Sequence, residues 1–212
     1  MSYEPARPAG RLLLTPQDKD VAARVRRLRR LGLGARAEPA FDAFADRLAE
    51  VTAVPYSMVN FIDENRQFFA GLHIPDGGDR DGGLGGDLDG GLGGELGGEP
   101  GGGLGGSPGV GRYMARDYGF CPHVVVRRKA LVLEDVCDYP RFAGNPVVDE
   151  IGVRSYLGAP LIDHTGIVLG TVCAVDIEPR PWGRAGLEII KSMAAELVEQ
   201  IELREGGGLP EG

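Results

Sequence analysis

The chain has 212 residues, of which 42% are hydrophobic and 25% charged, a length and balance that fit one globular domain with appendages. Its formal net charge is -8. The one basic cluster, residues 24–30, is too short to follow a phosphate backbone, so we expect no nucleic-acid partner. No stretch approaches the roughly 20 apolar residues that cross a bilayer, and the N-terminus has no apolar signal region. We therefore expect no membrane association and a cytoplasmic location.

The cysteines and histidines do not form a recognisable site by spacing. The chain has three cysteines, Cys121, Cys137 and Cys173, and no CxxC pair. An odd count at these spacings predicts neither a disulfide framework nor a zinc site of standard spacing, so we expect reduced thiols. The three histidines have no ligand-like spacing, and the chain has no phosphate-binding loop, GxSxG or HExxH motif. We assign no metal site and no catalytic residue from these patterns.

Glycine is concentrated in one part of the chain. Residues 76–111 contain 19 of the 35 glycines and seven acidic residues, and so few large apolar side chains cannot offset the entropy of ordering a chain. We expect a disordered acidic insert. Residues 82–87 resemble a calcium-binding β-roll repeat, but the repeat has period eight and too few copies to stack, so a tolerated loop expansion is favoured. Residues 1–17 and 206–212 are expected to be a flexible arm and tail around a single domain at 18–205.

The segment before the insert shows two helical patterns and a hairpin. In residues 18–31 apolar side chains recur every three or four positions, with arginines on the other faces, which predicts an amphipathic basic helix. A second helix is predicted at 39–51. Residues 56–63 and 66–72 are rich in strand formers on either side of a Glu-Asn turn, which predicts a β-hairpin.

After the insert, strands are predicted at 130–136, 156–162 and 167–175, the last two pairing antiparallel through a turn at 163–166. A final helix is predicted at 184–204. Its apolar stripe, spaced by three and four, either packs in the core or pairs with the first helix and a second subunit. The order of elements gives an α+β domain, an antiparallel sheet of about five or six strands flanked by helices.

Six short segments appear in an order that resembles the GAF domain family. They are Asn60-Phe61-Ile62-Asp63, Phe120-Cys121-Pro122-His123, Leu133-Glu134-Asp135-Val136, Asp138-Tyr139-Pro140-Arg141-Phe142-Ala143-Gly144-Asn145-Pro146, Arg154-Ser155-Tyr156-Leu157-Gly158-Ala159-Pro160-Leu161 and Gly170-Thr171-Val172-Cys173-Ala174-Val175-Asp176. The chain is similar to the bacterial branch of that family, whose members carry a Phe-Cys-x-His segment, an Asp-x-Arg-Phe-x-x-Asn-Pro segment and a Gly-x-Pro-Leu strand. The resemblance runs from about residue 28 to residue 201, interrupted by the insert.

The resemblance implies a PAS-like α+β sandwich with its terminal helices packed together. GAF domains serve mostly as sensory or dimerisation modules attached to kinases, cyclic-nucleotide enzymes or transcription activators, and this chain has no room for such an output domain. We therefore expect a stand-alone, non-catalytic sensory module in bacterial signal transduction. It would bind a small molecule or a partner protein, signal through a separate signalling protein, and form a homodimer through its terminal helices.

Cys121 and His123 are the first candidate ligand-binding residues. If a helix begins at Pro122, its positive end lowers the pKa of the Cys121 thiol and favours a thiolate. Redox chemistry or ligand contact is then one role for Cys121, and a buried structural thiol lining a pocket is the other. The three valines at 124–126 favour a strand locally, whereas the family has a helix here; we follow the family. His123 either hydrogen-bonds in the pocket or has a structural role.

Asn60, Phe120 and Tyr156 complete the candidate ligand-binding set. Asn60 is a polar residue on an otherwise apolar strand face, and its alternative role is to cap the sheet edge. Phe120 and Tyr156 belong to the segments that carry the resemblance. Asp135, Arg141 and Asn145 are expected to fix the turn and short helix around them, through bonds to local backbone and an arginine–carboxylate fork.

Three specific functions found within the family have sequence signatures that can be looked for in this chain. The cyclic-nucleotide signature is missing, because Asn60 is followed by Phe61 rather than Lys, and a bilin chromophore is not supported, because Pro122 separates the cysteine from the histidine. Free methionine sulfoxide reductases also use three cysteines, but spacings of 16 and 36 residues are wider than theirs. A thiol-dependent redox sensor or reductase centred on Cys121 is the alternative function. The sequence assigns no cofactor.

Overall fold

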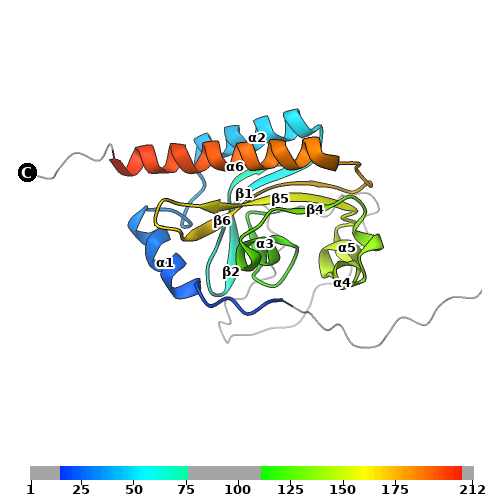
Figure 1. The fold of residues 1–212 in the computed structure, drawn as a ribbon, viewed down its shortest axis with the longest axis horizontal. Helices are drawn as coiled ribbons and strands as arrows, with labels where there is room; N and C mark the ends of the chain where they lie inside the picture. The colour runs from blue at the N-terminus through cyan, green and yellow to red at the C-terminus, as the bar shows by residue number, and fades with distance from the viewer. Residues whose placement is uncertain (1–14, 76–110, 207–212) are drawn as a thin grey trace, which may run out of the picture.

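The structure is a computed structural model that describes residues 15–75 and 111–206. Six antiparallel strands form one sheet in the order β3-β2-β1-β6-β5-β4, with helices on both faces (Figure 1). The strands are β1 (Tyr56–Ile62), β2 (Arg66–His73), β3 (Tyr113–Ala115), β4 (Leu131–Leu133), β5 (Ser155–Ile162) and β6 (Val168–Asp176). The helices are α1 (Val21–Arg30), α2 (Pro39–Thr52), α3 (Cys121–Arg127), α4 (Pro140–Ala143), α5 (Pro146–Glu150), α6 (Gly183–Gly206) and the 3-10 turn η1 (Val136–Asp138).

The two longest helices, α2 and α6, cover one face of the sheet (Figure 1). They are joined by an ion pair of 2.6 Å between Arg47 and Glu196, and both bury apolar side chains against alternate residues of the central strands. The predicted stripe on α6 is part of this core, because Ile190, Ala194 and Leu197 are all buried in it. A dimer formed through α6 would therefore have to use its other side.

The opposite face of the sheet carries the short helices α3, α4 and α5 (Figure 1). A second core cluster lies between them and the sheet. It receives Met58 from β1, Tyr156 from β5 and Cys173 from β6, whereas their neighbours in sequence point to the α2 and α6 side. The period of two along each strand therefore builds two separate cores.

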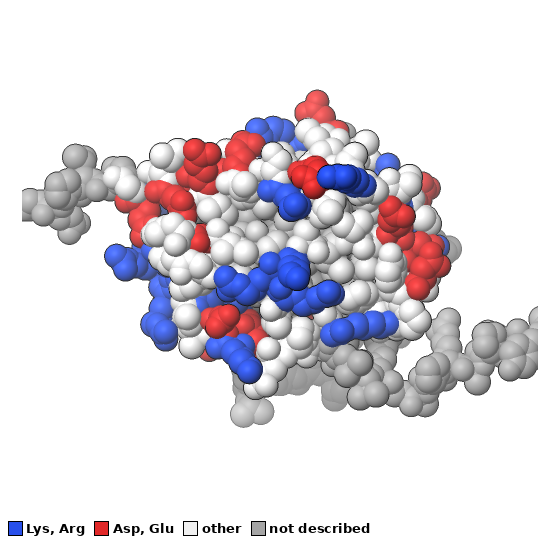
Figure 2. All heavy atoms as spheres, viewed as in Figure 1, with Lys and Arg blue, Asp and Glu red and all other residues white. Residues whose placement is uncertain are grey.

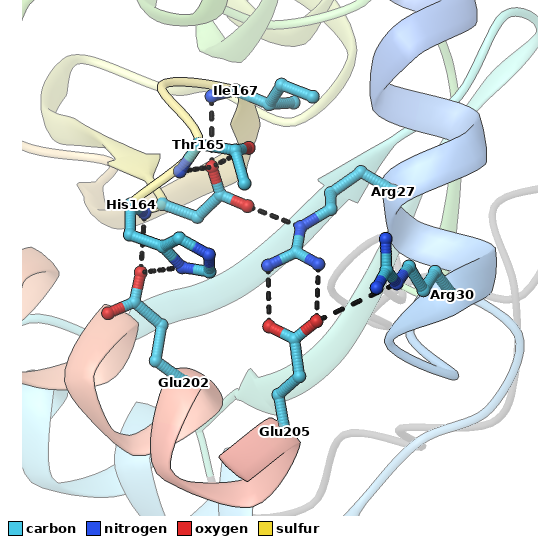
Figure 3. Close-up of polar contacts among 8 residues, drawn as sticks. Arg27, Arg30, His164, Thr165, Ile167, Glu202 and Glu205 are labelled. Atoms are coloured by element: carbon cyan, nitrogen blue, oxygen red, sulfur yellow. Dashed lines mark hydrogen bonds and ion pairs between the residues drawn. The ribbon is translucent and has the colours of Figure 1, made fainter.

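The first and last helices meet through charged side chains rather than through the apolar seam that the resemblance suggests. Arg27 of α1 bonds both carboxylate oxygens of Glu205 near the end of α6, each at 2.6 Å, and also bonds Asp163 in the β5–β6 turn at 2.6 Å (Figure 3). Along most of its length α6 packs on β5. The predicted packing of the terminal helices thus reduces to a polar contact at one end.

Local differences from the prediction have simple causes. The strand predicted at 130–136 ends at Leu133, because the Asp135 carboxylate accepts a hydrogen bond of 3.0 Å from the Cys137 N–H and begins η1. Strand β3 was not predicted. The helix α3 is confirmed in spite of its valines, since tertiary packing overrides their propensity.

The segments predicted to be disordered lie almost wholly outside the described residues, which begin at residue 15, resume at 111 and end at 206. Among the described helices, none combines the length and apolar character needed to cross a bilayer.

Candidate functional site

A cavity of about 50 Å³ lies between the sheet and the start of α3. Its walls are apolar and aromatic for the most part, and they include Phe120, Cys121 and Tyr156, three of the residues predicted to bind a ligand. Since a water molecule needs roughly 10–15 Å³ of such space, the cavity accommodates a group of a few atoms. The cavity therefore suits a small ligand.

Cys121 is the first residue of α3 and is buried at the cavity wall. Its Sγ lies 3.3 Å from the Tyr156 hydroxyl and 3.8 Å from the Cys173 Sγ. The hydrogen bond with Cys173 is the main cause that lowers the pKa of the Cys121 thiol, and it outweighs burial, which raises the pKa. The same contact raises the pKa of Cys173, so the pair favours one thiolate at Cys121.

Tyr156 reaches Cys121 because of a glycine on its own strand. A Cβ atom at Gly158 would collide with the Tyr156 ring and hydroxyl, so glycine at this position lets the ring lie along the sheet. Phe120 packs edge-on against Tyr156 with ring centroids 5.2 Å apart. Burial raises the pKa of Tyr156 well above its ordinary value, which keeps its hydroxyl protonated and able to donate to the Cys121 sulfur.

Asn60 is fully buried on β1, beside the Cys121 thiol rather than in the cavity wall. Its amide nitrogen donates to the Gln67 Oε1 at 2.8 Å, and Gln67 in turn donates to the Tyr118 carbonyl at 2.6 Å. Its Oδ1 has no hydrogen-bond partner among the described residues, and neither has the hydroxyl of Thr171, which pairs with Asn60 across β1 and β6. Both side chains help to lower the pKa of Cys121.

His123 belongs to an aromatic cluster and not to the cavity wall. Its ring packs edge-on against Phe142 at 5.0 Å between centroids, and its Nδ1 is buried without a partner among the described residues. Burial, with smaller contributions from Arg141 and Arg127, lowers the pKa of His123 to about 4. The imidazole is therefore neutral at neutral pH, and its environment favours the structural role over the ligand contact.

Asn145 and Asp135 have the structural roles that the sequence indicates. The Asn145 side chain accepts from the Gly119 N–H and donates to the Gly119 carbonyl, both at 3.0 Å, and so fixes the loop that leads into α3. Asp135 forms a fork with an arginine, as expected, but the arginine is Arg154 and not Arg141. Arg141 instead lies over the Phe142 ring.

Residues of the site that sequence reasoning missed include Met58, Gln67, Thr171 and Cys173. Cys173 is core, as predicted, yet its sulfur is in contact with Cys121. The one available signal was the period of two along β6, which places Thr171 and Cys173 on the same face.

The GAF domain family model matches residues 36–201 of the chain. A cyclic di-GMP phosphodiesterase of Pseudomonas aeruginosa is 27% identical over 177 residues, which are 80% of this chain and 24% of that protein. The chain thus spans about a quarter of the length of this curated relative.

Solved structures share the fold at low sequence identity. The GAF domain of an Acinetobacter phosphoenolpyruvate-protein phosphotransferase is 14% identical with a TM-score of 0.53, covering 91% of this chain and 99% of that one. A free methionine-R-sulfoxide reductase from Neisseria meningitidis, solved with its substrate, is also 14% identical, with a TM-score of 0.50 and coverage of 76% and 75%. Identities this low establish the fold alone. Together with the family match over most of the chain, the six-stranded sheet with its flanking helices shows that the protein belongs to the GAF domain family.

Proposed function

We propose that this GAF domain is a non-catalytic sensory module of the bacterial cytoplasm that binds a ligand of a few atoms in the cavity beside Cys121. One observation carries the proposal: a small apolar cavity lies beside the Cys121 thiol, and the buried side chains of Asn60 and Thr171, which lie outside the cavity lining, lower the pKa of that thiol. A ligand in the cavity would contact the Cys121 sulfur, whose thiolate these two side chains stabilise.

The size of the cavity limits the class of ligand. A space of about 50 Å³ holds only a few water-sized groups, whereas a cyclic dinucleotide is many times larger. The ligand proposed for this domain is therefore not the cyclic di-GMP named for the Pseudomonas relative, of which this chain covers 24%.

Native mass spectrometry before and after denaturation tests this function. We expect a small mass that is retained by the folded protein and released on unfolding, and we expect Thr171→Val to weaken its retention. Ser155→Ala is the matched control, because the Ser155 hydroxyl is also buried without a partner among the described residues. Its side chain lies on the side of the sheet that α2 and α6 cover, away from the cavity. A bare protein from every native preparation would contradict the proposal.

We further infer that the module works as a homodimer, with a signalling protein as its eventual target. A groove of about 640 Å³ lies between α6 and the β4–β5 edge. It is lined by apolar side chains including Val198, by basic Arg128 and Lys191, and by acidic Glu199 and Glu202. Figure 2 shows basic side chains along the lower side of a largely uncharged stretch beneath α6. Because the groove carries both charges, a second copy related by a two-fold axis can pair acid with base.

A second candidate function is a thiol redox sensor, favoured by the 3.8 Å contact between the Cys121 and Cys173 sulfurs. A hydroperoxide would oxidise the Cys121 thiol to a sulfenic acid and be reduced to an alcohol. The Cys173 thiol would then displace water and form the disulfide. Peroxide treatment of a Cys137→Ser variant, followed by peptide mapping, should give one internal Cys121–Cys173 disulfide; oxidation to sulfinic acid without a disulfide would exclude this function.

A further inference from the structure

We propose that Met58, Cys121 and Cys173 form a binding site for a soft monovalent metal ion, with Cu(I) as the natural occupant. The inference rests on the proposed function, because the site is part of the same cavity and the metal ion would be its ligand. All three residues line that cavity.

Two of the three sulfur–sulfur distances already match such a site. The Cys173 Sγ lies 3.8 Å from the Cys121 Sγ and 3.7 Å from the Met58 Sδ. Thiolate–metal bonds of about 2.3 Å, as found for zinc, would place the sulfurs of a trigonal site about 4 Å apart. Binding would therefore need only small side-chain movements.

Three elements of the fold hold these sulfurs in place. Strand β1 supplies Met58, which pairs directly with Cys173 of β6, and α3 supplies Cys121 from its first turn. All three side chains are buried. Because the donors sit on the sheet and on a packed helix, the site is preorganised, as precise metal sites require.

The chemistry of the cavity favours a soft ion over a hard one. Thiolate and thioether donors suit Cu(I), zinc and iron–sulfur clusters, whereas carboxylates suit magnesium and calcium. Zinc takes four Cys, His or carboxylate ligands in structural sites, so two cysteines with a methionine favour Cu(I). The described lining of the cavity contains no carboxylate and no imidazole, and a fourth sulfur, that of Met114, belongs to the same lining. Among the described residues, no three side chains of His, Cys, Asp or Glu gather as metal donors, so the methionine sulfur is essential to this site.

The surroundings of Cys121 also suit a bound thiolate. The Tyr156 hydroxyl lies 3.3 Å from its sulfur and would donate to the metal-bound thiolate, the kind of outer contact that orients ligands in metal sites. Cys173 loses its proton when the metal–sulfur bonds form, and Cys121 binds as the thiolate, so binding releases protons. No electron is transferred, and the copper stays monovalent. Spacings of 63 and 52 residues between the three donors explain why no sequence motif indicates the site.

Competition for Cu(I) against bicinchoninate, on the full reduced chain without oxygen, tests the proposal. We expect one Cu(I) per chain and an X-ray absorption spectrum with only sulfur neighbours at about 2.3 Å. Cys121→Ser and Cys173→Ser should each abolish binding, and Met58→Leu should weaken it by more than about tenfold. Met58→Leu changes side-chain volume little, so the variant should fold.

Two control variants separate this site from adventitious thiol binding. Cys137→Ser removes the exposed cysteine, and Met193→Leu changes a methionine of the other core cluster; both should bind Cu(I) as the parent does. Loss of binding in Cys137→Ser, unchanged binding in Met58→Leu, or oxygen or nitrogen neighbours in the spectrum would overturn the proposal. If the native protein retains an organic mass and takes up no Cu(I), the copper site fails while the small-molecule sensor stands. If it retains neither, both fail.

Discussion

Arg27 on α1 binds Glu205 near the end of α6 through two parallel hydrogen bonds of 2.6 Å, and a third bond of 2.6 Å reaches Asp163. Figure 3 shows that the guanidinium lies between the two carboxylates, with Arg30 and the His164–Glu202 pair around it. This cluster joins the two ends of the described chain through the turn between β5 and β6. A change in the packing of the sheet can therefore reach both terminal helices through one side chain.

Removing Arg27 should destabilise the protein. The Asp163 side chain is fully buried, so Arg27→Ala leaves its charge without the ion pair, and breaking a buried pair costs roughly 3 kcal/mol. Arg30→Ala is the matched control on the same helix, because Arg30 is 79% exposed and 3.9 Å from Glu205; it should cost less than about 0.5 kcal/mol. Urea unfolding measures both values, and equal losses would argue against the buried role of Arg27.

The same cluster should make stability depend on pH. Burial alone would raise the pKa of Asp163, but the Thr165 hydroxyl and Arg27 outweigh it and lower the pKa, and Arg27 lowers that of Glu205. A carboxyl pKa that is lower in the folded state stabilises the protein at pH values above the ordinary pKa values of 3.8 for Asp163 and 4.5 for Glu205. This stability is lost as the pH falls below those values. Urea unfolding from pH 6 to pH 3 should therefore show a steeper decline for the parent than for Arg27→Ala. Parallel curves would mean that the cluster does not control acid stability.

Asn145→Ala should loosen the start of α3 and expose Cys121. The side chain makes two hydrogen bonds to Gly119, and their loss, at about 1–2 kcal/mol, should raise the rate of local opening about tenfold. Alkylation followed by peptide mapping measures this rate at each cysteine. The exposed Cys137 should react first and at the same rate in both proteins. Asn65 is exposed, so the control variant Asn65→Ala should leave Cys121 protected from alkylation. Faster labelling of Cys121 in this variant as well would indicate a general loss of stability.

The groove beside α6 predicts a dimer that a single charge disrupts. Light scattering at micromolar concentration should give twice the chain mass of 22.5 kDa, and Val198→Glu should give the single-chain mass. Val51→Glu is the control, because Val51 is 52% exposed on α2 and outside the groove. A parent protein with the single-chain mass would rule out the dimer.

Most of the fold could be predicted because its signals are local. The spacing of apolar residues along α6 and the strand-forming residues of β1 each identify their element without any distant contact. The failures lie where long-range contacts decide. Strand β3 has three residues and exists because Arg66, Gln67 and Phe68 pair with it, so its own sequence says little.

The site was only partly predictable for the same reason. Phe120, Cys121 and Tyr156, which the sequence predicts to bind a ligand, line the cavity, and all three belong to segments with a recognisable pattern. The contact between Cys121 and Cys173 depends on how α3 crosses β6, and the position of Asn60 depends on a shift in the β1–β2 register between Val59 and Asn60. Since a slip of one residue turns a strand over, neither relation can be read from alternation alone.

The pairing of β2 with β3 also determines how the domain tolerates changes in length. The Phe69 N–H donates to the Arg112 carbonyl at 2.8 Å. The chain therefore leaves the sheet at the end of β2 and rejoins it beside β2, where β3 forms the edge. For a flexible connection between two fixed ends, doubling the length costs only about 0.6 kcal/mol of closure entropy. Sequence can therefore be added or removed in this connection as long as β2 and β3 stay paired, because Phe69 of β2 and Met114 of β3 both line the cavity.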